Sequence, residues 1–216
     1  MPLTKEKLSD RAINSNKLIL CEGEDEYDLL VMLRDESGLS DIDVKIATAK
    51  GRSNIERRWE LIQKQANASK ITTLAIIFDS EQDPVASNQW AEQFVAKYQT
   101  SILKVIVHQL PSSTLAGSIE TLIRSGLEKS SLGFDCATQW EACVQANEAT
   151  AFSLKAKQDK AWLQVWLTHR TTSTASRIGF AIKNDGSPKK VLRSEVDSAL
   201  EPLRTILKSV LAVPNV

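Results

Sequence analysis

Residues 72–78 constrain the fold more than any other segment, because they run Thr-Thr-Leu-Ala-Ile-Ile-Phe and end abruptly at Asp79. A strand with one face in water alternates apolar and polar side chains, whereas the central strand of a parallel sheet is buried on both faces. The segment follows the second pattern, and Pro84 stops any continuation. It therefore predicts a central parallel strand.

Three more apolar runs, at residues 17–21, 43–47 and 102–107, predict further strands. The segments between them have the apolar spacing of helices: one from Asp25 to the Ser37-Gly38 pair, one over 53–66 and one over 86–98. Ser53 is the expected N-cap of the second, with Glu56 completing a capping box. The series predicts an α/β protein with a Rossmann-like, mostly parallel four-stranded sheet and helices on both faces.

Beyond Pro111 the periodicity is helical, over 118–125, 138–146, 151–168 and 194–211. Pro202 is expected to kink or break the last helix, and residues 171–176 and 184–188 have loop composition. We therefore expect a polar leader at 1–16, an α/β core at 17–122 and a mainly helical C-terminal extension, packed on the core, at 123–216.

The overall charge does not indicate a partner, because 27 Lys and Arg balance 27 Asp and Glu. The three cysteines lack the spacing of a zinc site or a disulfide scaffold, so we expect reduced and mostly buried thiols. No segment has the apolar core of a signal peptide or the length of a membrane span. These features predict a cytoplasmic protein without a membrane partner, and they do not fix its oligomeric state.

Acidic side chains follow two of the expected strands. Glu22 ends the run at 17–21, and the sequence Asp79-Ser-Glu-Gln-Asp places Glu81 and Asp83 after the central strand. Binding crevices of open parallel sheets lie beyond the carboxyl ends of the strands, so we expect these acids to converge. Carboxylate oxygens suit Mg²⁺ or Mn²⁺.

Other acids have an ordinary explanation. Glu24, Asp25, Glu26 and Asp28 lie in the first turns of a helix, where acids complement the helix dipole and are commonly solvated. Glu120 either completes the acidic shell or is a first-turn glutamate of its own helix.

Two segments, Leu-Ile-Leu-Cys-Glu-Gly-Glu-Asp-Glu at 18–26 and Ala-Ile-Ile-Phe-Asp-Ser-Glu at 75–81, resemble the Toprim pattern. In that pattern one strand ends in Glu-Gly and a later strand ends in Asp-x-Asp. Residues 117–122 (Gly-Ser-Ile-Glu-Thr-Leu) are similar to an acidic segment in a branch of Toprim proteins related to the overcoming-lysogenization-defect (OLD) nucleases. The resemblance covers roughly 17–122 and implies a Toprim-type sheet.

The resemblance also implies roles for individual residues. Glu22 takes the position of the acid/base or metal-associated glutamate, and Asp79 and Glu81 take that of the magnesium-binding pair, although Glu81 replaces an aspartate. Glu26 represents a further acid of the family, the one often found three residues after the glycine of the Glu-Gly pair. Lys160 is the expected catalytic lysine, because related nucleases are thought to use a lysine to stabilise developing charge.

Basic residues suggest where a phosphate backbone would bind. Lys50 and Arg52 precede the second helix, and a stretch from Lys155 and Lys157 to Arg193, which includes Arg177, is rich in cations. The alternative is that these residues form solvated surfaces. Trp162 and Trp166, one turn apart on a helix, would either stack on bases or pack in the core, and the apolar residues beside them favour the core.

These observations favour a magnesium-dependent phosphoryl-transfer protein, a nuclease acting on DNA or RNA. The alternative is a non-catalytic Toprim-like module that binds nucleic acid or a partner protein and regulates it. A third hypothesis is a receiver-like or haloacid-dehalogenase-like phosphotransfer domain in which Asp79 is phosphorylated, but no lysine follows a later strand as those folds require. A Gly-rich phosphate loop is absent from the sequence, which disfavours an ATPase or a dinucleotide enzyme.

Overall fold

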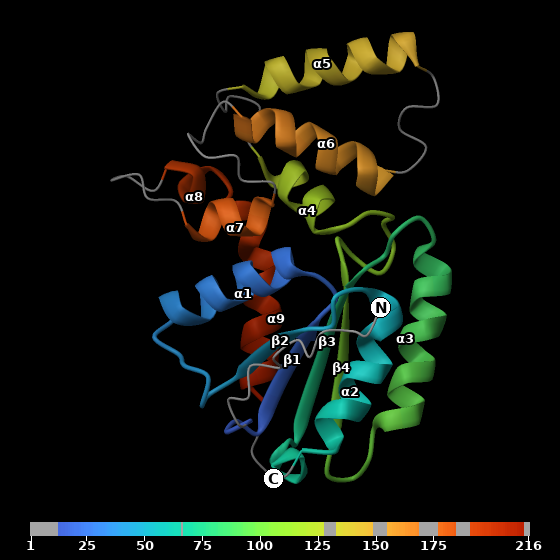
Figure 1. The fold of residues 1–216 in the computed structure, drawn as a ribbon, viewed down its shortest axis with the longest axis vertical. Coiled ribbons are helices and arrows are strands. Elements are labelled where there is room, and N and C mark those ends of the chain that lie inside the picture. Colours follow the sequence, from blue (N-terminus) through green and yellow to red (C-terminus); the bar gives the residue numbers. More distant parts are fainter. Residues whose placement is uncertain are drawn as a thin grey trace, which may run out of the picture.

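A single parallel sheet organises the protein. The computed structural model describes residues 13–65, 67–127, 133–148, 155–168, 177–184 and 191–213. The sheet has the order β2-β1-β3-β4, and every pairing in it is parallel. Its strands are β1 (Lys17–Cys21), β2 (Lys45–Thr48), β3 (Thr73–Asp79) and β4 (Lys104–Leu110). The α/β fold class is confirmed (Figure 1).

The central position of β3 explains its sequence. All of its residues except the last, Asp79, are buried, because β1 and β4 flank it and helices cover both faces. Phe78 and Ile76 face one side of the sheet, whereas Ile77 and Ala75 face the other. The apolar run therefore reflects burial on both faces, as predicted.

Helices cover the two faces of the sheet in separate cores. The helices α2 (Ile55–Gln63) and α3 (Pro84–Tyr98) pack on one face through side chains such as Trp59 and Phe94. The helices α1 (Glu24–Glu36) and α9 (Glu201–Leu211) cover the other face, as Figure 1 shows. The expected arrangement of helices on both faces is confirmed.

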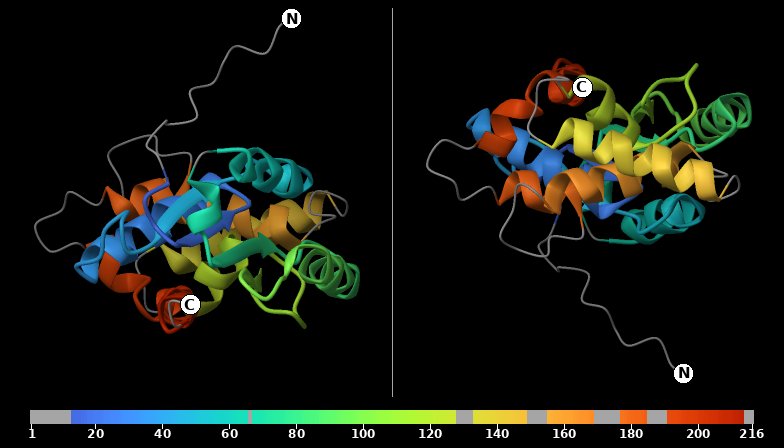
Figure 2. Two further views of the ribbon diagram at one scale, coloured as in Figure 1. Left: turned by 90° about the horizontal axis from the view of Figure 1, so that it is seen from below. Right: turned by 90° about the horizontal axis from the view of Figure 1, so that it is seen from above.

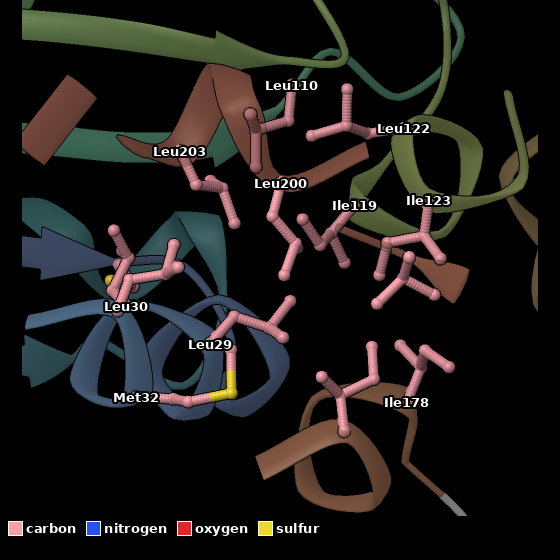
Figure 3. Close-up of a cluster of buried hydrophobic side chains, with 14 of the residues drawn as sticks. Leu29, Leu30, Met32, Leu110, Ile119, Leu122, Ile123, Ile178, Leu200 and Leu203 are labelled. Atoms are coloured by element: carbon pink, nitrogen blue, oxygen red, sulfur yellow. The ribbon is translucent and has the colours of Figure 1, made fainter. Parts of the chain in front are cut away.

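The remaining helices extend the second core beyond the carboxyl end of the sheet. In the view from above in Figure 2, α5 and α6 lie over that end. Figure 3 shows Leu29 of α1, Ile119 of α4 and Ile178 of α7 pointing into one shared cluster. The elements are α4 (Ile119–Gly126), α5 (Phe134–Asn147), α6 (Lys155–Thr168), α7 (Ile178–Lys183), α8 (Val191–Glu195) and the 3₁₀ turn η3 (Ser198–Leu200).

One predicted helix start is wrong, and one predicted helix break is confirmed. A 3₁₀ turn, η1 (Arg52–Asn54), precedes α2, so the N-cap is Asn54 rather than Ser53 and the capping box with Glu56 does not form. The helix expected over 194–211 is broken before Pro202, as predicted: α8 ends at Glu195, η3 spans Ser198–Leu200, and Pro202 lies in the first turn of α9. The first-turn N–H groups of a helix have no intrahelical partner, so proline is tolerated there.

The helices α7 and α8 were not predicted, because segments of five or six residues are too short to show a helical period. Several other predictions cannot be compared with the structure. The leader at 1–12, Ala66, residues 151–154, and the loops at 171–176 and 185–188 lie outside the described residues.

The aromatic and cysteine side chains give a mixed outcome. Trp162 and Trp166 are both 0% exposed, so the core interpretation is confirmed and base stacking is wrong. Cys21 is buried as expected, whereas Cys136 and Cys143 are exposed because α5 buries little more than one edge. In the described part of the chain, no helix is both long and apolar enough to cross a membrane.

Candidate metal centre

The ends of β1 and β3 bring two acids together. The strands are neighbours with Cys21 opposite Ile77, so Glu22 and Asp79 emerge at the same edge of the sheet. The Glu22 N–H donates to the Ile77 carbonyl at 2.8 Å, and the Asp79 N–H donates to Glu22 Oε2 at 3.2 Å. The parallel register thus places two carboxylates, 57 residues apart in the chain, side by side.

These two acids line a pocket of about 530 Å³. The structure brings six of the predicted site residues into it: Glu22, Glu26, Lys50, Asp79, Glu120 and Lys160. Glu24, Asp25 and Arg177 also line it. The pocket therefore combines carboxylates from β1, α1, β3 and α4 with cations from three other segments.

Backbone N–H groups hold the carboxylates in place. Asp79 Oδ1 accepts from the Ile119 N–H at the start of α4 at 3.0 Å. Glu26 Oε2 accepts from the Gly23 N–H at 3.1 Å. A Cβ atom at Gly23 would lie 2.7 Å from that Glu26 oxygen, so the Glu-Gly sequence leaves room for the Glu26 carboxylate. Each acid is therefore oriented by local structure.

Burial and mutual repulsion disfavour the ionised forms of the carboxyl groups in this pocket. Burial, together with the nearby Glu26 and Glu22 carboxylates, raises the pKa of Asp79 well above its usual value. Burial also raises the pKa of Glu26 to about 7, with repulsion from Glu120 adding to the shift. The pKa of Glu22 is raised by burial and partly lowered again by the Asp79 N–H. A cation bound in the pocket would favour the ionised carboxylates and reduce their mutual repulsion.

The donor set fits a hard divalent cation. Carboxylate oxygens are the ligands that Mg²⁺ and Mn²⁺ prefer, and Glu22, Glu26, Asp79 and Glu120 supply them from four elements. Within the described ranges, no three His, Cys, Asp or Glu side chains already stand in a metal-binding arrangement. Side-chain rotation would have to draw these carboxylates together around the ion.

Glu81 and Asp83 do not line the pocket. Asp83 caps α3, because its Oδ1 accepts from the Ala86 N–H at 3.0 Å. Glu81 has a φ of 56° and forms an isolated antiparallel bridge with Gly117, and its side chain is exposed. Its charge nevertheless raises the pKa of Glu22, so it lies within electrostatic range of the pocket.

The four residues predicted to bind nucleic acid have different surroundings. Lys50 lines the pocket. The Arg52 guanidinium lies 4.8 Å from the centre of the Phe78 ring and donates to Ser87 Oγ at 2.8 Å, so the side chain packs against β3 and α3. The other two lie in the first turn of α6 and are exposed: Lys155, which pairs with the buried Asp159, and Lys157. Of the basic stretch from Lys155 to Arg193, Arg170, Lys189 and Lys190 lie outside the described residues.

The acids at the start of α1 are not solvated as expected. Asp25, Glu26 and Asp28 are buried, and α7 covers two of them. The Gly179 N–H donates to Asp25 Oδ1 at 2.8 Å, and Arg177 pairs with Asp28 at 2.9 Å. Only a glycine fits at position 179, because a Cβ atom there would lie 2.4 Å from the Asp25 carbonyl oxygen. The sequence signal was the apolar Ile-Gly-Phe-Ala-Ile segment directly after Arg177.

Comparisons with known proteins give a family and a distant structural likeness. The family described as "Protein of unknown function (DUF3226)" matches residues 16–211. A solved structure, the C-terminal region of the Burkholderia pseudomallei OLD protein, is similar at a TM-score of 0.38 and 13% identity. That alignment covers 89% of this chain and 98% of the other. No curated protein matches the sequence.

Proposed function

Since the chain belongs to the DUF3226 family of proteins of unknown function, we propose from its own residues that it is a Toprim-type, divalent-metal-dependent phosphoryl-transfer protein that cleaves DNA or RNA. One observation carries the proposal. Glu22 and Asp79, which end two neighbouring parallel strands, share a pocket with Glu26, and burial and the neighbouring carboxylates raise the pKa values of Asp79 and Glu26 there. The Toprim-like segments 18–26 and 75–81 contain these same residues.

Each residue would have a distinct part in the reaction. A bound Mg²⁺ or Mn²⁺ would neutralise phosphate charge and orient the reacting phosphate. Asp79, Glu26 and Glu120 would hold the ion. Glu22, whose pKa is raised by burial, would hold or release a proton at its carboxylate. Lys160, 3.5 Å from Glu120, would stabilise charge that develops on the phosphate.

The test compares metal-dependent cleavage of single-stranded DNA, duplex DNA and RNA by the wild-type protein and matched variants. Glu22→Gln and Asp79→Asn keep the size of each side chain, and we expect each to lower the rate by about a hundredfold or more. Glu92→Gln, at an exposed position on α3, serves as the control and should cleave like the wild type. Unchanged cleavage in both pocket variants would exclude the assignment.

A second candidate is a non-catalytic module that binds nucleic acid or a partner protein. The position of Glu81 favours it, because the side chain expected to complete the metal-binding pair does not line the pocket. This alternative predicts that the wild-type protein binds nucleic acid or protein in Mn²⁺ without turnover. Cleavage that is lost in Asp79→Asn would exclude it.

A further inference from the structure

The pocket contains a guanidinium from the C-terminal part of the chain, Arg177, that the metal chemistry does not use. Arg177 directly precedes α7 and lines the pocket together with Glu24 and Asp25 of α1. Its side chain is 35% exposed. An arginine that lines a pocket and remains partly open to solvent is placed to meet a ligand there.

Contacts with α1 fix the Arg177 side chain without using all of its donors. Nη2 donates to Asp28 Oδ2 at 2.9 Å. Nη1 lies 3.6 Å from Glu24 Oε2, which is beyond hydrogen-bonding distance. The guanidinium is therefore held through Nη2, while Nη1 can donate a hydrogen bond to a ligand. A planar fork with one edge anchored is pre-organised for an oxyanion.

Arg177 is not the sole cation that pairs with Asp28. Lys183 also pairs with this buried carboxylate, at 3.1 Å, and it does not line the pocket. Lys183 therefore shares the neutralisation of Asp28, and Arg177 can bind a ligand through Nη1 while Nη2 stays on Asp28. Lys160 differs, because it faces the buried Glu120 and would leave that carboxylate if it moved.

The anchoring of α7 explains how Arg177 reaches the pocket from so late in the chain. The Gly179 N–H donates to the Asp25 carboxylate, and the absence of a side chain at Gly179 lets the α7 backbone touch α1. Arg177, two residues earlier, is thereby directed toward the pocket acids. If this segment served only to anchor α7 on α1, it would not need a cation that faces the pocket.

We propose that Arg177 binds a phosphate oxygen of a nucleic-acid strand whose backbone lies in the pocket. This inference rests on the proposed function and deepens it. Asp28 keeps Nη2, and Nη1 donates to a non-bridging oxygen. The acids hold the cation, and Arg177 holds the strand. Arg177 thus positions the substrate and takes no part in proton transfer.

The test is the affinity for a short fluorescent single-stranded DNA, measured in Ca²⁺ at several salt concentrations to separate binding from cleavage. Loss of a charge-assisted hydrogen bond should weaken binding by Arg177→Ala about tenfold. It should also lower the slope of log affinity against log salt by roughly 0.7, as expected for one phosphate contact on a single strand. Arg177→Lys should restore the slope but not the full affinity.

The matched control is Lys183→Ala, which removes the other cation on Asp28 without changing the pocket wall, and it should bind DNA like the wild type. Equal losses in the Arg177→Ala and Lys183→Ala variants would show an anchoring role and overturn the inference. So would an Arg177→Ala variant with wild-type affinity and slope. If the wild-type protein itself binds neither DNA nor RNA, the proposed function fails together with the inference, and that outcome is distinct from the other two.

Discussion

The molecule contains two groups of buried carboxylates with opposite electrostatics. At the junction of α4, α5 and α6, Arg124 forms a bidentate pair with Glu141 at 2.7 and 2.8 Å and reaches Asp159 at 2.8 Å. Asp159, with a fully buried side chain, also accepts from Thr121 and pairs with Lys155. We call these residues the junction cluster. The other group is the pocket acids: Glu22, Glu26, Asp79 and Glu120.

The difference lies in where the compensating charge comes from. Every carboxylate of the junction cluster has a guanidinium or ammonium partner within the fold. Among the pocket acids, Glu120 lies 3.5 Å from Lys160, whereas burial and the neighbouring carboxylates raise the pKa values of Asp79 and Glu26. Buried acids with built-in cations hold helices together, whereas buried acids without them are suited to a cation from solution.

The largest expected effect comes from removing the compensating cation of the junction cluster. Arg124→Met would leave Glu141 and Asp159 buried without their main partner, and we expect the free energy of unfolding to fall by roughly 3 to 5 kcal/mol. Urea denaturation measures the change. A loss below about 1 kcal/mol would show that the cluster contributes little and would remove the contrast between the two groups.

Neutralising a pocket acid should raise the free energy of unfolding of the metal-free protein, whereas removing Arg124 should lower it. The pKa of Glu26 is raised to about 7 from an ordinary 4.5, so the folded protein keeps a proton that the unfolded chain loses. This contribution to stability is present below the ordinary pKa and is lost as the pH rises through about 7. In metal-free buffer near pH 8, Glu26→Gln should therefore be more stable than the wild type, by on the order of 2 kcal/mol.

The measurement is denaturation in EDTA from about pH 5 to about pH 8, with Glu92→Gln as the control. The advantage of Glu26→Gln should disappear toward the acidic end of the range. A variant that is less stable than the wild type at every pH would show that the Glu26 carboxylate is compensated within the fold.

A smaller effect would separate helix capping from metal binding at Asp83. Asp83→Ala removes the side chain that accepts from the Ala86 N–H, which should lower the free energy of unfolding by about 1 kcal/mol. Because Asp83 does not line the pocket, the affinity for Mn²⁺ should not change. Isothermal titration with Mn²⁺ checks this. A large loss of affinity would show that Asp83 is a metal ligand, as the sequence predicted.

The sequence predicted the sheet because burial leaves a direct signal. A strand such as β3, covered on both faces, must be apolar throughout, and the acid that follows it marks the end of the strand. The juxtaposition of Glu22 and Asp79 then follows from the parallel register. These features depend on local composition and on one topological rule.

The surroundings of α1 were not predictable in the same way. Asp25 and Asp28 look like solvated first-turn acids, and only the docking of α7, about 150 residues later, buries them. A six-residue helix has no clear period, and the fit between Gly179 and the α1 backbone depends on tertiary contact. The different positions of Glu81 and Glu26 relative to the pocket likewise depend on loop geometry.

The most direct test of the account is a crystal of the protein soaked in Mn²⁺ and measured for anomalous scattering. We expect a peak in the pocket, within coordination distance of oxygens from Glu26, Asp79 and Glu120. The peak should be absent from the Asp79→Asn variant and from crystals treated with EDTA. A fully soaked crystal with no peak among these three carboxylates, or with a peak only elsewhere, would contradict the account.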